Sequence, residues 1–238
     1  MIHILFPTEL EAGPLTGSLS DVSGTSLGGR RGYEGALGVI KVAVFITGIG
    51  QVNTAQTMAA ILEQRPDASF IMGGIAGAFI GAGLKVGDVA VATEEVYADL
   101  GAITPTGFIG LEDMGLPLAA PATGPVYGSF PLKSDFAFLA GAGGGLFDVK
   151  AGRFLTVSTV SGTSASGDTL WRRFGALCEN MEGAAGAQVA AHYNASFVEV
   201  RGISNMVEDR DRSRWDIDAA TKNCAVVIKK LVEAGTWS

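Results

Sequence analysis

The chain has 238 residues, of which 47% are hydrophobic and only 17% are charged, and it contains 34 glycines. This length suits one large α/β domain with a full core, so we predict a single domain over residues 1–238. The net charge of −7 would repel a phosphate backbone, so we expect no nucleic acid partner. Sparse charge on a glycine-rich chain also fits an enzyme that buries surface in a homo-oligomer.

Cysteine and histidine are too few to predict a metal centre or a disulfide framework. Two of each occur, namely Cys178, Cys224, His3 and His192, so we expect no metal and no other cofactor. The longest nearly apolar run, residues 70–84, is shorter than the roughly 20 residues that cross a bilayer. The N-terminal residues lack the basic region of an export signal. The sequence therefore predicts a cytoplasmic protein with no membrane partner.

Short apolar runs alternate with helical segments along the chain. Strands are predicted at residues 2–6, 33–37, 39–47, 68–72, 86–92, 154–160 and 196–200. Helices are predicted at residues 54–63, 168–174, 183–192 and 218–234. This alternation predicts an α/β fold with a mixed, largely parallel central sheet flanked by helices on both faces.

Polar residues follow several of these runs, where α/β sheets bind their ligands. Pro7 ends the first strand, Thr8 is a predicted helix cap, and Glu11 follows at the capping-box position. The apolar run 196–200 is predicted to deliver Arg201 and Asn205 to a strand end. We therefore expect Glu11, Arg201 and Asn205 to share one site.

Two segments have less definite predictions. The turn at Gly48 and Gly50 lies between a strand and a helix, but Asn53 replaces the third glycine of a dinucleotide fingerprint. We interpret it as a close backbone approach to a small ligand. Residues 104–152 are rich in proline and too long for a plain connection, so we predict a lid or a subunit contact. Within them, Ser134 or Asp135 could cap a helix.

A series of short motifs resembles the nucleoside phosphorylase and nucleosidase family over most of the chain. The motifs are Glu11 after the first strand, Gly48-Ile49-Gly50-x-Val52, Gly74-x-Ala76-Gly77 with Val86-Gly87-Asp88, Ser166-Gly167-Asp168, Met181-Glu182-Gly183-Ala184-Ala185 and Val200-Arg201-x-Ile203-Ser204. Within the family, the segments 180–183, 201–207 and 210–215 are most similar to the futalosine hydrolases. The resemblance implies a nucleoside phosphorylase-like fold, a homo-oligomer, and hydrolysis of futalosine, a hypoxanthine nucleoside of menaquinone biosynthesis.

The resemblance implies roles at the sugar. Glu11 matches the residue that activates water in the nucleosidases, and Arg201 would hold Glu11 and the water in place. Glu182 would accept hydrogen bonds from the ribose hydroxyls, and Met181 would pack on the ribose face. Each residue also has a structural interpretation: Glu182 as a carboxylate at a helix N-terminus, and Arg201 as half of an ion pair. Ile75 departs from the methylthioadenosine nucleosidases, which carry a serine there.

The base would contact three residues. Leu170 and Trp171 fall where the family's base-stacking residues lie, and Asp168 is more simply a helix cap. Asn205 replaces the aspartate of enzymes that act on 6-aminopurines. An amide can donate to O6 of a 6-oxopurine and accept from the N7–H that forms, whereas a carboxylate would repel O6. Such a mismatch discriminates by roughly 10⁴-fold. A turn asparagine is the alternative.

The remaining part of the substrate is less specified by the sequence. The carboxyphenyl group of futalosine requires an apolar groove and a cation. These could come from Trp215 with a nearby arginine or from the segment 108–118, and the candidates are Arg210, Arg212 and Arg214. Carboxylates after the first strand would repel phosphate, which favours water as the nucleophile. The alternatives are a purine nucleosidase for inosine-like or 5′-thio nucleosides, and a nucleoside-binding protein without activity.

Overall fold

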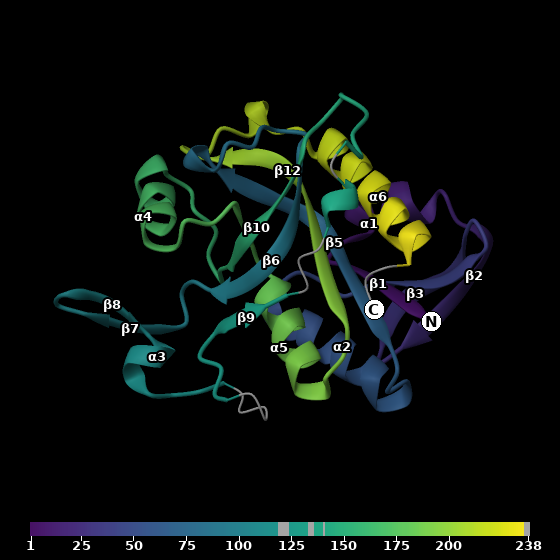
Figure 1. The fold of residues 1–238 in the computed structure, drawn as a ribbon, viewed down its shortest axis with the longest axis horizontal. Coiled ribbons are helices and arrows are strands. Elements are labelled where there is room, and N and C mark those ends of the chain that lie inside the picture. The colour runs from purple at the N-terminus through teal and green to yellow at the C-terminus, as the bar shows by residue number, and fades with distance from the viewer. Residues whose placement is uncertain (119–123, 133–135, 140, 236–238) are drawn as a thin grey trace.

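The framework is a mixed β-sheet with helices on both sides, shown as a computed structural model in Figure 1. The structure describes residues 1–118, 124–132, 136–139 and 141–235. The strands are β1 (Ile2–Phe6), β2 (Ser20–Leu27), β3 (Arg30–Leu37), β4 (Ile40–Ile46), β5 (Ser69–Phe79), β6 (Val89–Tyr97), β7 (Gly101–Thr104), β8 (Gly107–Gly110), β9 (Ser129–Pro131), β10 (Val149–Thr156), β11 (Cys178–Asn180) and β12 (Phe197–Val207).

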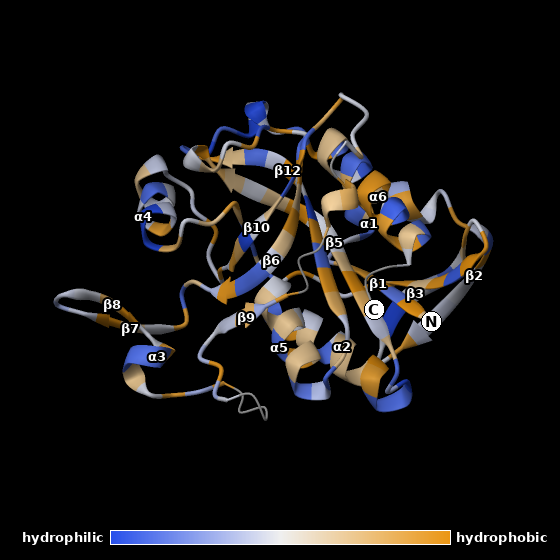
Figure 2. Ribbon diagram, viewed as in Figure 1, coloured by the Kyte–Doolittle hydropathy of each residue, from blue (hydrophilic) through white to orange (hydrophobic). Residues whose placement is uncertain are grey.

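The helices connect these strands. They are α1 (Glu9–Thr16), α2 (Gln51–Gln64), α3 (Leu111–Met114), α4 (Ser164–Phe174), α5 (Gly183–Tyr193) and α6 (Ile217–Ala234), with 3-10 turns η1 (Ile80–Ala82), η2 (Ala137–Leu139) and η3 (Arg212–Arg214). Apolar residues of α1 and α6, such as Leu15 and Leu231, share one core cluster with the strands. Those of α2 and α5, such as Met58 and Ala187, share another. Figure 2 shows the hydrophobic residues along the central strands that these helices cover.

The order of the strands brings distant segments together. Strands β4, β1, β5 and β12 run parallel to one another, and β12 is antiparallel to β6. Strand β11 pairs with both β10 and β5, so β5, β12, β6, β10 and β11 close into a ring. Gly77 on β5 is in register with Glu179 on β11 and with Asn205 on β12. The ring therefore places these two polar residues on either side of a glycine.

The prediction of a mixed α/β sheet flanked by helices is confirmed. The first strand and the small-residue helix after Glu182 lie where the sequence predicts them. The predicted end of a strand at Arg201 is wrong, because β12 continues to Val207. Arg201 is tolerated within the strand because Glu199 neutralises its charge at 2.8 Å. The run from residue 68 also continues further than predicted, through Phe79.

Helix α4 begins earlier than predicted. Thr163, not Asp168, is its N-cap, and the Thr163 hydroxyl accepts a hydrogen bond from the backbone N–H of Ser166 at 3.2 Å. Asp168 instead lies within the helix, 3.8 Å from Arg172 one turn later. The capping prediction was wrong because a serine or threonine at an earlier position satisfies the first turn equally well.

The segment 104–152 contains little regular structure. The β7–β8 hairpin projects from the body of the molecule at the left of Figure 1, and α3 follows it. Strand β9 joins the sheet by pairing with β6. Ser134 and Asp135 lie outside the described residues, and a lid or subunit contact stays a prediction. Within the described ranges, no helix is both long and apolar enough to cross a membrane.

Candidate active site

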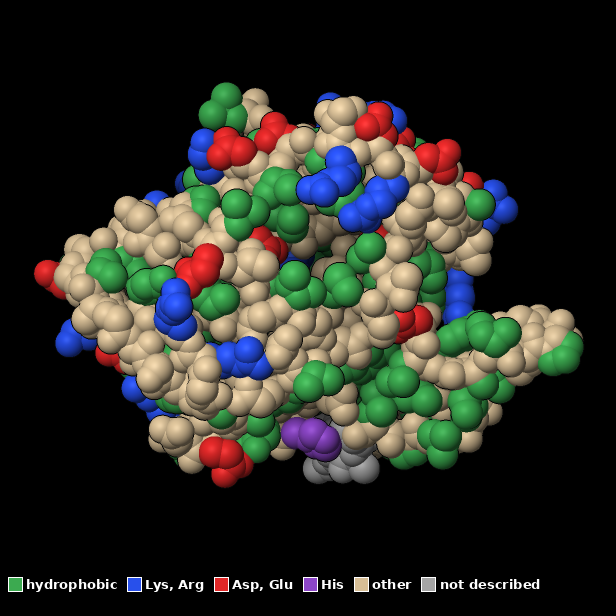
Figure 3. Space-filling model, turned by 180° about the vertical axis from the view of Figure 1, so that it is seen from behind, with side chains coloured by type: hydrophobic (Ala, Val, Ile, Leu, Met, Phe, Trp, Pro, Cys, Tyr) green, Lys and Arg blue, Asp and Glu red, His purple; other side chains and the backbone are tan. Residues whose placement is uncertain are grey.

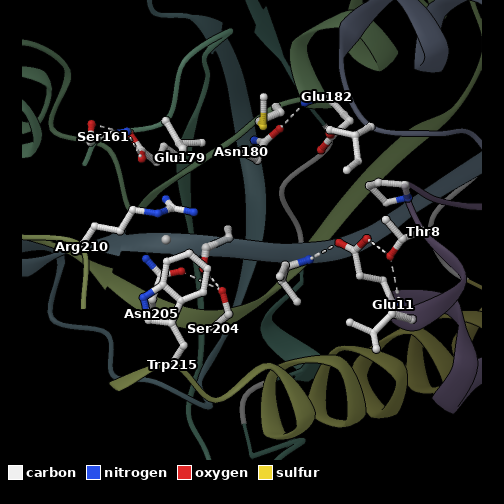
Figure 4. Close-up of a pocket in the computed structure, with 18 residues that line it drawn as sticks. Thr8, Glu11, Ser161, Glu179, Asn180, Glu182, Ser204, Asn205, Arg210 and Trp215 are labelled. Carbon is white, nitrogen blue, oxygen red and sulfur yellow. Dashed lines mark hydrogen bonds between the residues drawn. The ribbon is translucent and has the colours of Figure 1, made fainter. Parts of the chain in front are cut away.

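A cavity of about 330 Å³ lies beside β5, β11 and β12. Four of the residues predicted for the site line it, namely Glu11, Met181, Glu182 and Asn205. Figure 4 shows Glu182 across the cavity from Asn205, with Glu11 at one end. The molecular surface is hollowed on the face seen in Figure 3, where hydrophobic and basic side chains border the hollow. Segments from both halves of the chain thus meet around one cavity.

Glu11 lies in the first turn of α1 and is buried. Its carboxylate accepts hydrogen bonds from the Thr8 hydroxyl at 2.6 Å and from the backbone N–H of Ile75 at 3.0 Å. Burial raises the pKa of Glu11, and these two hydrogen bonds and the charge of Arg201 partly oppose the rise. A carboxylate that is held in place with a raised pKa is suited to accept a proton.

Glu182 lies at the start of α5 with both carboxylate oxygens fixed. One oxygen accepts a hydrogen bond from the backbone N–H of Gly50 at 2.9 Å, and the other lies 3.2 Å from Nη1 of Arg201. Gly50 has a φ of 95°, which favours glycine, so the glycine turn brings its N–H to Glu182. The predicted backbone approach at this turn is therefore made to a site carboxylate.

Arg201 is fully buried beneath the cavity and is absent from its described lining. Its guanidinium pairs with Glu182 at 3.2 Å and with Glu199 at 2.8 Å. Glu199 reaches the same guanidinium because residues two apart on a strand point to one face. Among the described residues, the ion pairs of Arg201 do not include Glu11. It acts on Glu11 through its charge, which opposes the rise in the pKa of Glu11.

A buried network of hydrogen bonds holds the backbone at Glu182 in place from the core side. The Asn180 amide oxygen accepts hydrogen bonds from the backbone N–H groups of Glu182 at 2.9 Å and Gly183 at 2.7 Å. The Asn180 amide nitrogen donates to Glu95 at 2.6 Å. Burial and the charge of Glu199 hold the pKa of Glu95 well above its usual range. A Cβ at Gly183 would collide with Glu95 and Glu199, so this position requires glycine.

The amide of Asn205 has a defined orientation. Its oxygen accepts a hydrogen bond from the Ser204 hydroxyl at 2.8 Å, and its nitrogen donates to the Met206 carbonyl at 3.0 Å. An amide nitrogen has two N–H groups and an amide oxygen has two lone pairs, so each atom keeps one free hydrogen-bonding position. Gly77 provides space, since a Cβ there would lie 3.0 Å from the amide nitrogen.

Leu170 and Trp171 do not belong to the described lining of the cavity. Both lie on α4, where Leu170 packs against a core cluster and Trp171 packs on Gly81. Both residues were expected in a helix, as found, but the contacts of that helix leave them outside the described lining. The aromatic side chain in the lining is instead Trp215, which follows η3.

The three arginines predicted as candidates for binding the carboxyphenyl group differ in whether they line the cavity. Arg210 lines the cavity, and its guanidinium lies 4.8 Å from the ring of Trp215. Arg214 pairs with Glu208 at 2.7 Å, and neither it nor Arg212 is in the described lining. The other candidate segment, 108–118, is likewise missing from that lining, and its Phe108 lies under Arg173. Of the two candidate regions, only the one containing Arg210 and Trp215 reaches the cavity.

Sequence reasoning left several site residues without a role. Glu179 and Ser161 line the cavity, and Asn180 connects it to the buried acids. The run Glu179-Asn180-Met181-Glu182 indicates buried polar contacts, because polar residues next to an apolar segment are costly to bury without partners. The partners of Asn180 come from strands distant in sequence, so their identity required the fold.

Comparison with known proteins identifies the class of this chain. The sequence profile of the phosphorylase superfamily matches residues 2–234. The chain therefore belongs to the phosphorylase superfamily. It is 38% identical over 181 residues to a futalosine hydrolase of Acidothermus cellulolyticus, covering 75% of this chain and 70% of that protein. It is 34% identical over 186 residues to a futalosine hydrolase of Thermus thermophilus, covering 78% of this chain and 79% of that protein.

Solved structures show the same fold. A 5′-methylthioadenosine/S-adenosylhomocysteine nucleosidase of Helicobacter pylori superimposes with a TM-score of 0.81 at 22% identity, covering 98% of this chain and 97% of that one. An S-adenosylhomocysteine nucleosidase of Streptococcus pyogenes superimposes with a TM-score of 0.79 at 26% identity, covering 98% of this chain and 96% of that one.

Proposed function

We propose that this protein is an N-glycosyl hydrolase that cleaves futalosine and releases hypoxanthine. Its similarity to futalosine hydrolases over about three quarters of the chain supports the proposal. The observation that carries it is the amide of Asn205, which is oriented in the cavity with one donor and one acceptor position available. Hypoxanthine presents the matching acceptor, O6, and the matching donor, the N7–H that forms as the bond breaks.

Glu11 is the proposed general base. Cleavage of the glycosidic bond passes through a sugar cation, so water needs only modest activation to attack the anomeric carbon. Glu11 accepts the proton of that water, and its raised pKa makes it a better proton acceptor than an exposed glutamate. The N–H of Ile75 and the hydroxyl of Thr8 keep the carboxylate in place during the transfer. The reaction thus uses a carboxylate whose position is set by the fold.

Glu182 and Met181 are the proposed ribose-binding residues. The two fixed oxygens of Glu182 retain lone pairs for the 2′ and 3′ hydroxyls, and Met181 offers an apolar surface for the sugar face. Hydrogen bonds from the hydroxyls to a carboxylate become stronger as the ring gains positive charge. Glu182 therefore stabilises the transition state more than the substrate.

Asn205 is the proposed partner of the departing base. Its free amide N–H donates to O6, and its oxygen accepts from the N7–H that forms as the bond breaks. Ser204 and Met206 hold the amide in the orientation that this pairing requires. A protonated N7 makes hypoxanthine a better leaving group. The amide of Asn205 cannot supply this proton, which comes from solvent, but its oxygen stabilises the N7–H once formed, so recognition of the base and catalysis use the same side chain.

The carboxyphenyl group of futalosine remains, and Arg210 and Trp215 are its candidates in the cavity lining; Figure 4 shows both beside Asn205, so this group would have to fold back next to the base. The indole offers a flat apolar surface, and the guanidinium can bind a carboxylate through two hydrogen bonds. Both side chains line the cavity. Leu170 and Trp171 are outside the described lining, so we assign them no contact with the base.

The charges in the cavity favour water over phosphate as the nucleophile. Glu11, Glu179 and Glu182 line it, and among the described lining residues Arg210 is the single arginine or lysine. Three carboxylates would oppose the entry of a phosphate dianion. A homo-oligomer in the cytoplasm stays a prediction from the sequence.

The function is tested by incubating the purified protein with futalosine, with and without inorganic phosphate, and measuring free hypoxanthine by chromatography. We expect release that does not depend on phosphate. A parallel panel of inosine, adenosine and 5′-methylthioadenosine separates futalosine hydrolysis from a broader nucleosidase. The proposal fails if futalosine stays intact, or if another nucleoside is cleaved with a higher kcat/KM.

Replacing Thr8 by valine should move the acid limb of the pH profile of kcat/KM to higher pH. A general base works when ionised, so kcat/KM falls as pH falls through the pKa of Glu11. The Thr8 hydroxyl donates to the ionised carboxylate and lowers this pKa, so its loss raises the pKa further. Thr8→Ser keeps the hydroxyl and is the control. An acid limb at the same pH in all three proteins would contradict the assignment of Glu11.

A further inference from the structure

Glu179 is a second carboxylate in the cavity that the proposed mechanism does not use. It lies on β11 and is 4% exposed, and it contributes to the cavity lining. The Ser161 backbone N–H donates to one of its oxygens at 2.7 Å, and the Ser161 hydroxyl donates to the other at 2.8 Å. Both oxygens are therefore acceptors, and each keeps a lone pair for another donor.

The position of Glu179 relative to Asn205 is defined by the sheet. Both residues are in register with Gly77, on opposite sides of it. Neighbouring strands lie roughly 4.8 Å apart, so the two backbones are separated by about 10 Å. Both side chains line the same cavity, and Figure 4 shows them on opposite sides of it with Arg210 drawn between them. The space above Gly77 is thus bounded by an amide on one side and a carboxylate on the other.

A 6-oxopurine matches this pair of groups. Along one edge, hypoxanthine presents N7, the O6 acceptor and the N1–H donor. If Asn205 binds O6 and N7, then N1–H points away from it toward the other side of the space. Adenine has no hydrogen on N1 and would place a lone pair against a carboxylate that only accepts. Asn205 therefore distinguishes hypoxanthine from adenine at position 6, and the carboxylate of Glu179 distinguishes them at N1.

We propose that Glu179 accepts a hydrogen bond from N1–H of the base and so determines, together with Asn205, the preference for 6-oxopurines. This inference rests on the proposed function for the identity of the base. Ser161 is its positioning residue, because it holds both carboxylate oxygens. Burial raises the pKa of Glu179, and an N–H donor from the ligand would stabilise its ionised form.

The test measures the binding of free bases by calorimetry, independently of turnover. Wild type should bind hypoxanthine about 10- to 100-fold more tightly than 1-methylhypoxanthine, which lacks the N1–H. Glu179→Gln keeps the size of the side chain but can donate to N1 of adenine. It should weaken hypoxanthine binding at least ~10-fold without weakening adenine, whereas a purely structural role would weaken both bases equally.

Two further variants make the result decisive. Glu112→Gln removes an exposed glutamate of α3 outside the cavity lining and should bind both bases as wild type does. Ser161→Ala keeps the carboxylate and the backbone donor, so it should shift the preference less than Glu179→Gln, in the same direction. If Glu179→Gln does not fold, the 1-methylhypoxanthine comparison and Ser161→Ala decide the question.

The assay separates this inference from the proposed function. Hypoxanthine release from futalosine by wild type is measured in parallel. If futalosine is cleaved but Glu179→Gln leaves the ratio of hypoxanthine to adenine affinity unchanged, the inference alone is overturned. If futalosine is not cleaved but the ratio falls as expected, the proposed function fails and the role of Glu179 in base recognition stands.

Discussion

Glu11→Gln should lower kcat for futalosine by about 10²- to 10⁴-fold, the usual contribution of a positioned general base. The amide oxygen can still accept from the N–H of Ile75, and the Thr8 hydroxyl can turn to accept from the new NH₂ group. The side chain should therefore keep its place but lose the ability to take a proton from water. Steady-state kinetics and hypoxanthine binding should be measured on the same preparation.

Glu9→Gln is the matched control for this change. Glu9 precedes Glu11 by two residues on the same helix, but it is exposed and contacts Arg31 and Tyr33. Its substitution should leave kcat within twofold of wild type. A Glu11→Gln protein that binds hypoxanthine normally and keeps wild-type kcat would show that another group activates the water.

Asn205→Asp should change the preferred base. A carboxylate at this position would face O6 with repulsion but could accept from the 6-amino group of an adenine nucleoside. We expect kcat/KM for futalosine to fall by about 10³- to 10⁴-fold, while its 6-amino counterpart loses much less. The measurement is the ratio of kcat/KM for the two nucleosides in wild type and variant.

Asn205→Ala separates base recognition from general damage to the site. It removes both hydrogen-bonding atoms, so it should lower kcat/KM for both nucleosides. The ratio of the two kcat/KM values should be closer to one than in wild type or in Asn205→Asp. Equal losses for both nucleosides in Asn205→Asp would refute the proposed role of the amide. The Glu179 proposal predicts that Asn205→Asp alone will not produce full preference for adenine, because the N1 side still favours 6-oxopurines.

Much of the fold was predictable because local and tertiary preferences agree. The apolar run from Ile2 to Phe6 had no competing structure, and Pro7 ended it. The small residues after Glu182 pack closely as a helix, as their pattern indicated. The exact end of β12 was not predictable, because Arg201 is an acceptable strand residue only when buried carboxylates surround it, and one of them comes from another segment.

The part of the candidate site that was predictable is the part carried by motifs that occur in the same order as in the family. Glu11, Met181, Glu182 and Asn205 gather around one cavity as expected. Trp171 lies in a helix as predicted, but its packing against Gly81, outside the described lining, depends on tertiary contacts that no local pattern specifies. Glu179 was visible as a carboxylate, but its relation to the base depends on strand pairings that no local pattern specifies.

Arg201 joins the proposed ribose-binding carboxylate, Glu182, to the buried core. It balances Glu182 on the cavity side and Glu199 on the inner side, and Glu95 lies next to Glu199. Removing one partner of a buried ion pair costs about 3–5 kcal/mol, and here two acids would lose the same cation. Loss of activity in an Arg201 variant would therefore report mainly on a weakened scaffold. Engineering a different sugar preference should begin at the cavity wall and leave this shared cation untouched.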